Sequence, residues 1–155
     1  MNCLITAREA AFKVLGSFRR SGTLPGDALG ALTKEMQPQD SALAMRIVNG
    51  VLQNTALIDY YISHFSSIKL KKIEPRVLDI LRLSVYQLVF MTKIPHSAAV
   101  DEGVKLAAMN ANPRAAGFAN ALLRKIADAS AVMALPQVTG GNAAQILAIK
   151  HSHPE

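Results

Sequence analysis

Apolar residues recur along most of the chain at intervals of three and four residues, and almost no segment alternates as a β-strand would. The first helical pattern begins with Thr6 and Glu9, which form a capping-box pair, and is expected to end at Ser21-Gly22. The side chains expected to face its core are Ala11, Val14, Leu15 and Phe18. This periodicity predicts an all-α protein.

Prolines and capping residues mark the starts of the following helices. Pro25 opens a short second helix, Pro38 opens a third, and Asn54-Thr55 begins a fourth. The polar loop "SSIKLKKIE", residues 66–74, is then expected to separate the chain into two halves. The segments before this loop therefore predict four helices in the first half.

Three more helices are expected after the loop, beginning near Pro75, Pro95 and Pro113. The helix from Pro75 is apolar nearly all round, so we expect it to be the buried centre. In the next helix, the acids Asp101 and Glu102 are expected to favour the positive N-terminal end of the helix dipole. The total predicted is about seven helices.

Two similar segments, "IVNGVLQ" at 47–53 and "FANALLR" at 118–124, suggest two helical sub-bundles packed together, although amphipathic helices can resemble one another by chance. The helical pattern is expected to end at about Asp128. After it, "ASAVMALPQVTGGN" contains small residues, a proline and a Gly pair. We therefore predict a helical domain over residues 1–128 and a linker segment over residues 129–155.

Charge and composition narrow the functional class. The 155 residues include 17 Lys plus Arg against 11 Asp plus Glu, a net charge of +6, which favours a polyanionic partner such as RNA. No uninterrupted apolar stretch reaches the roughly 18 residues that a membrane span needs, and "MNCLITARE" lacks the pattern of a secretion signal. Together with a single cysteine, Cys3, these features predict a cytoplasmic protein that does not enter a membrane.

Two basic clusters are candidate RNA-binding sites. On a helical wheel of the first helix, four cations form a sector opposite Val14 and Leu15 that could track phosphates, unless it is only a solvated face. Phe12 lies beside this sector and could stack on a base or belong to the core. The cations of the first helix are Arg8, Lys13, Arg19 and Arg20. The second cluster, in the loop between the halves, consists of Lys69, Lys71, Lys72 and Arg76, which would give affinity without reading sequence.

A third candidate surface lies on the seventh predicted helix, opposite Phe118, Leu122 and Ile126. Its small side chains would allow close approach of an RNA backbone, another domain or a helix of the same bundle. Packing within the bundle is favoured, because helices that cross closely commonly use Gly and Ala. The residues of this surface are Arg114, Gly117, Asn120, Ala121 and Arg124.

No catalytic residue, metal ligand or cofactor site is predicted. Cys3 has no neighbouring base, and Gly140-Gly141 follows no strand, so neither a reactive thiol nor a nucleotide-binding turn is expected. Asp101 and Glu102 are adjacent, hence about 100° apart on a helix, and cannot face one substrate. His151, His153 and Glu155 could in principle hold a metal ion. They lie in a terminal tail that contains no cysteine, however, and such a tail rarely binds a metal.

Three stretches resemble the NusB family: "AREAAFKVL" at 7–15, "RVLDILRLSVYQLVFMTKIPHSAAVDEGVKLA" at 76–107 and "GFANALLRK" at 117–125. The resemblance covers most of residues 4–128. It implies an all-helical fold of two bundles with a basic surface that contacts RNA.

Within that family, "LRLSVYQL", "IPHSAAVDEGV" and "NALLRK" are similar to the N-terminal domain of RsmB-type small-subunit rRNA cytosine-C5 methyltransferases. In those enzymes a "SHPEW"-like stretch leads into the catalytic part, and this sequence finishes at Ser152–Glu155, "SHPE". The resemblance implies a non-catalytic domain that helps to seat small-subunit rRNA against a C-terminal methyltransferase domain. That domain would use S-adenosylmethionine, for which this chain has no site.

Two alternatives remain open. One is a freestanding NusB-type antitermination factor that binds RNA with a ribosomal-protein partner. Such factors tend to carry an arginine-rich N-terminus, whereas here only Arg8 precedes the core of the first helix. The other is a helical module that binds only proteins. The first alternative predicts RNA binding that weakens with salt, and the second predicts none.

Overall fold

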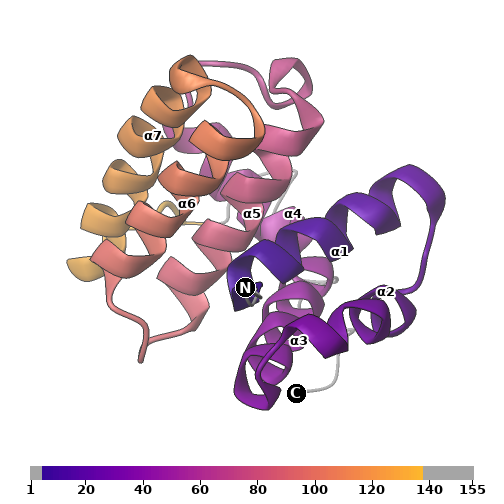
Figure 1. The fold of residues 1–155 in the computed structure, drawn as a ribbon. Helices are drawn as coiled ribbons and strands as arrows, with labels where there is room; N and C mark the ends of the chain where they lie inside the picture. The colour runs from indigo at the N-terminus through magenta and orange to yellow at the C-terminus, as the bar shows by residue number, and fades with distance from the viewer. Residues whose placement is uncertain (1–4, 138–155) are drawn as a thin grey trace. The chain divides into compact units, whose positions relative to one another are not determined.

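The computed structural model describes residues 5–137, and every regular element in that range is a helix (Figure 1). The all-α prediction is confirmed, and the seven α-helices begin within one residue of the predicted positions. The elements in chain order are α1 (Ala7–Ser21), α2 (Pro25–Leu32), the 3₁₀ turn η1 (Thr33–Glu35), α3 (Pro38–Gln53), α4 (Thr55–Phe65), the 3₁₀ turn η2 (Leu70–Lys72), α5 (Pro75–Phe90), α6 (His96–Asn110) and α7 (Pro113–Ala131).

The chain divides into two compact units, and the boundary lies inside α3, between Gly50 and Val51. The prediction that the loop at residues 66–74 separates the halves is therefore wrong. Helix α4 belongs to the second unit because it packs against α5 and α7 and buries Leu57, Ile58 and Ile62. The periodicity of α4 indicated a helix but could not show which partners would cover its apolar face.

In the first unit, α1 begins and ends as the sequence predicts. The hydroxyl of Thr6 accepts the Glu9 N–H at 3.1 Å, and the Glu9 carboxylate accepts the Thr6 N–H at 3.2 Å. The helix ends at Gly22, whose φ of 72° lies in the left-handed region that glycine adopts without strain. All buried residues of α1 lie between Ala7 and Gly16.

Phe18 is a correction to the predicted core. It continues the apolar stripe of α1 but is 40% exposed, because it lies in the last turn, beyond the buried part of the helix. The other predicted core residues of α1 are buried: Ala11, Val14 and Leu15.

Helix α5 is the centre of the second unit, as predicted. Ten of its sixteen residues are buried, and it packs against α4, α6 and α7. Figure 1 shows α5, α6 and α7 side by side, with consecutive helices running in opposite directions. A helix covered on several sides needs apolar residues all round, which explains its sequence pattern.

The expected dipole role of Asp101 and Glu102 is wrong. Helix α6 begins at His96, and its first turn contains no acidic residue. The two acids lie one turn further on, where the effect of the dipole has largely faded. Glu102 instead accepts a hydrogen bond from the Lys105 ammonium at 3.2 Å.

Helix α7 continues three residues beyond the predicted end at Asp128, to Ala131. Met133 follows it with a φ of 55°, so a methionine takes the left-handed position at which glycine is usual. The predicted linker at 129 therefore starts inside a helix. None of the helices in the described range is both long and apolar enough to cross a membrane.

Several sequence predictions lie outside the described residues. They concern Cys3, Gly140-Gly141, His151, His153 and the "SHPE" stretch that finishes at Glu155. These remain predictions from sequence.

Candidate nucleic-acid interface

The four cations of the first predicted cluster all lie on α1. Lys13, Arg19 and Arg20 are exposed, and Arg8 is half-buried. Arg8 and Arg19 each interact with other groups of the protein. Among the described residues, no ion pair engages Lys13 or Arg20, so their charges are available to a ligand.

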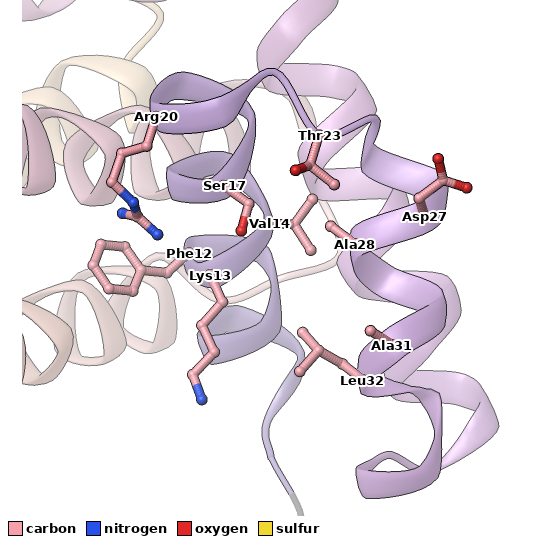
Figure 2. A pocket seen from close by; sticks show the side chains of 10 residues that line it. All are labelled: Phe12, Lys13, Val14, Ser17, Arg20, Thr23, Asp27, Ala28, Ala31 and Leu32. Atoms are coloured by element: carbon pink, nitrogen blue, oxygen red, sulfur yellow. The ribbon is translucent and has the colours of Figure 1, made fainter.

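A pocket of about 470 Å³ lies between α1 and α2, inside the first unit. Figure 2 shows Val14 of α1 directed toward α2, whose side chains Ala28, Ala31 and Leu32 face it across the opening. The lining residues are Phe12, Lys13, Val14, Ser17, Arg20, Thr23, Asp27, Ala28, Ala31 and Leu32. Two of the predicted cations and the candidate stacking residue Phe12 thus meet at one concave site.

The end of the Arg20 side chain lies against α1 at Gly16. One of its terminal nitrogens lies 2.7 Å from the position that a β-carbon on residue 16 would occupy. Figure 2 shows the Arg20 side chain pointing back along α1 toward the Phe12 ring. The absence of a side chain at Gly16 therefore lets the guanidinium lie along the helix beside the pocket.

Charge is distributed unevenly around the pocket. The cations Lys13 and Arg20 come from α1, whereas the one acid of the lining, Asp27, comes from the first turn of α2. The hydroxyl groups of Ser17 and Thr23 add hydrogen-bonding groups to an otherwise apolar wall. Such a lining suits a ligand with an anionic end and a flat apolar body.

The second predicted cluster lies at η2 and the start of α5, in the second unit. Lys69, Lys71 and Lys72 are exposed, as is Arg76. The Arg76 guanidinium donates from Nε to the Glu74 carboxylate at 2.7 Å, and a second nitrogen lies 2.5 Å from the same oxygen. Glu74 therefore partly neutralises this cluster, and its three lysines carry most of its positive charge.

The third predicted surface, on α7, does not pack within the described protein. Arg114, Gly117, Ala121 and Arg124 are exposed, and a β-carbon added at Gly117 would meet open space. The favoured interpretation, packing against another helix of the bundle, is therefore wrong. The half-buried Asn120 accepts a hydrogen bond from Arg124 Nε at 2.9 Å, so these two polar groups are held together at the surface.

The second surface and the start of the third lie at one end of their unit. Figure 1 shows η2 at the end of the bundle where both α5 and α7 begin. Arg76 and Arg114 each occupy the second position of their helix, so both lie at that end. Arg76 and Arg114 are 38 positions apart in the sequence, which could not show that both lie at the same end of the unit.

Several residues of the site were missed in the sequence. Ser17, Thr23 and Asp27 carry no signal by themselves, because the pocket exists only where α1 and α2 pack together. Gly16 could have been found, since it lies four residues before Arg20 and therefore on the same face of the helix. In residues 5–137 no group of three or more His, Cys, Asp or Glu side chains is arranged to hold a metal ion.

The fold and these surfaces define a class: an all-helical domain with a cationic pocket in one unit and basic surfaces on the other. Comparison with protein families places it more closely. The chain belongs to the NusB family, whose model matches residues 5–128. The family prediction is confirmed.

Curated relatives fall into two groups. A probable ribosomal RNA small subunit methyltransferase B of Bacillus subtilis (strain 168) is 34% identical over 123 residues, which cover 78% of this chain and 27% of that protein. The transcription antitermination protein NusB of Bacillus velezensis is also 34% identical over 123 residues, which cover 78% of this chain and 92% of that protein. The chain thus spans about a quarter of the methyltransferase and nearly all of the antitermination protein.

Solved structures share the fold. NusB of T. maritima superimposes with a TM-score of 0.71 and 26% identity, covering 79% of this chain and 88% of that chain. NusB in its complex with NusE and double-stranded RNA gives a TM-score of 0.70 at 24% identity, covering 79% and 94% of the two chains. The second likeness concerns the fold alone.

Proposed function

We propose that this chain is a non-catalytic RNA-binding domain whose first helix contacts the RNA. The observation that carries the proposal is the basic surface of α1 in a NusB-family chain: Lys13, Arg19 and Arg20 are exposed on one helix. Exposed cations in a row neutralise successive phosphates and release their counterions. The pocket beside them supplies an apolar wall that a solvated helix face would not need.

We further propose that the domain serves a small-subunit rRNA methyltransferase. Support comes from relatives that are named as such methyltransferases in Bacillus subtilis and Synechocystis, each matched over little more than a quarter of its length. In this arrangement the domain helps to position rRNA, and a separate methyltransferase domain binds S-adenosylmethionine and performs the chemistry. The exposed face of α7 is a candidate contact for that domain or for RNA.

A second candidate function is that of a freestanding antitermination factor, with a ribosomal protein as its partner. It is favoured by one observation: the match to the Bacillus velezensis antitermination protein extends over 92% of that protein. Both functions would use the same RNA-binding surface. In the first it is joined to a methyltransferase domain, and in the second it acts with a ribosomal protein.

Fluorescence anisotropy with a labelled single-stranded RNA of about ten nucleotides tests RNA binding. We expect log K to fall linearly with log salt concentration, by about 0.7 for each phosphate contacted. Arg19→Glu with Arg20→Glu should abolish most of the binding. Lys34→Glu with Lys93→Glu changes the net charge equally on exposed residues outside α1 and should weaken binding much less. Equal losses in both double variants would contradict the assignment to α1.

The size of the native polypeptide separates the two functions. An antibody against this domain, applied to the source cells, should detect a product much larger than 16.6 kDa if the domain is part of a methyltransferase. A product of about that size would instead favour the antitermination factor.

A further inference from the structure

We propose that the pocket between α1 and α2 holds one unstacked nucleotide of a single-stranded RNA, with its phosphate on the α1 side. This inference rests on the proposed function and assigns a specific site within it. The pocket volume of about 470 Å³ lies in the lower part of the range for small-molecule sites, which suits one nucleotide.

The position of the phosphate follows from charge. Lys13 and Arg20 border the pocket from α1, and no ion pair within the described residues competes for them. Asp27 borders it from α2 and repels an anion. A phosphate is therefore attracted to the α1 side of the opening, where Arg20 can offer two N–H groups to one phosphate.

The base has an aromatic surface available. Phe12 is half-buried and lines the pocket, so its ring is held by the protein yet still reachable. The apolar side chains of Ala31 and Leu32, both accessible, line the same cavity. Unpaired bases in protein complexes stack on aromatic rings in this way, and the hydroxyls of Ser17 and Thr23 can meet the polar edge of the base.

Gly16 positions Arg20 for this role. A methyl group at residue 16 would overlap the end of the flexible Arg20 side chain, which can swing away at little cost to the fold. The variant Gly16→Ala keeps every charge and ring of the pocket and displaces only the guanidinium. It also replaces a glycine inside a helix, which favours the folded state.

The test uses the full chain and two probes. With the labelled RNA described above, we expect Phe12→Leu to weaken binding about tenfold through loss of stacking, and Gly16→Ala to weaken it about fivefold. Gly16→Ala should at the same time unfold at an equal or higher urea concentration. Lys13→Gln should also weaken RNA binding. Lys34→Gln is its control, because it removes the same charge from an exposed lysine of the same unit outside the pocket, and it should weaken binding less.

The second probe is uridine 5′-monophosphate, added to ¹⁵N-labelled protein and followed by NMR. We expect shifts concentrated on the amides of Phe12, Lys13, Ser17 and Thr23, and smaller shifts with inorganic phosphate or uridine alone. If RNA binds with a salt slope but Phe12→Leu and Gly16→Ala bind like the original chain, the pocket proposal is wrong and the proposed function stands. If the chain binds no RNA, the proposed function itself is wrong. If the pocket amides respond to an amphipathic helical peptide and not to the nucleotide, the site binds protein and the proposal is overturned.

Discussion

Ser84 of α5 and Gly103 of α6 lie so close together that a β-carbon at position 103 would overlap the Ser84 hydroxyl. The Leu123 side chain of α7 approaches the same point to 3.0 Å. Ser84 is fully buried, and its hydroxyl donates to the Ile80 carbonyl at 2.8 Å, which holds the side chain in place. Gly103 therefore sets how closely α5, α6 and α7 pack against one another.

We predict that Gly103→Ala lowers the free energy of unfolding by about 1–3 kcal/mol, because overpacking must displace buried groups. Urea denaturation of the full chain measures this. Adding Ser84→Ala should recover part of the loss, since it removes the nearest clashing atom. Gly117→Ala is the matched control: that glycine faces open space on α7, so the change should stabilise by up to about 1 kcal/mol through helix propensity. Equal effects at the two glycines would contradict the packing argument.

The ion pair between Arg82 of α5 and Asp59 of α4 should stabilise the second unit. Two guanidinium nitrogens donate to the two carboxylate oxygens at 2.8 and 2.9 Å, and both side chains are only about a fifth exposed. We predict that Asp59→Ala costs about 2 kcal/mol of unfolding free energy, as expected for a shielded charged pair. Glu74→Ala, which breaks the exposed pair with Arg76, should cost less than about 0.5 kcal/mol. If added salt strongly reduces the loss of unfolding free energy caused by Asp59→Ala, water screens the Arg82–Asp59 pair more than its burial suggests.

The end of α7 offers a stabilising substitution at Met133. Its left-handed backbone is accompanied by hydrogen bonds from Met133 N to Ser130 O at 3.2 Å and from Ala134 N to Ala129 O at 2.7 Å, the pattern of a Schellman motif. Met133→Gly should raise the free energy of unfolding by about 0.5–1 kcal/mol, because glycine adopts this conformation without strain. The same change at Val132, whose φ is −105°, should destabilise. Thermal or urea unfolding distinguishes the two variants.

Stability should fall in strong alkali partly because of Tyr61. Burial raises the pKa of its hydroxyl above the ordinary value of 10.0, and the nearby Tyr60 adds to the rise. Above pH 10 the unfolded chain loses this proton while the folded chain keeps it, so unfolding becomes more favourable as pH increases. The stability that the Tyr61 hydroxyl contributes is complete below pH 10 and is lost as the pH rises past the pKa of Tyr61 in the folded chain. Tyr61→Phe should show a smaller loss of stability above pH 10 in urea denaturation, and an unchanged loss would contradict the assignment.

The candidate site was only partly predictable from the sequence. The helical wheel of α1 placed Lys13 and Arg20 on one side, and both line the pocket. The wheel could not supply the opposite wall, because Ala31 and Leu32 belong to another helix and reach the site only by packing. For α7 the composition of Gly117 and Ala121 suggested close packing, but no described element covers that face.

The helices and most of their ends could be predicted from the sequence alone. Helix formation and capping depend on neighbours within four residues, so Thr6, Gly22 and the prolines at Pro75 and Pro113 marked boundaries without reference to the rest of the chain. This prediction failed at the end of α7, because Met133 occupies a position that is usually marked by glycine.

The grouping of the helices and the meeting of polar residues depend on packing between distant segments, which the sequence does not reveal. Helix α4 could cover either half until its contacts with α5 and α7 were known, and Gly103 became essential only when Ser84 lay against it. The same holds for the pocket, where Gly16 and Phe12 gain their significance from Arg20 and the facing wall of α2. Periodicity reports which side of a helix is apolar, whereas packing between distant segments decides what that side meets.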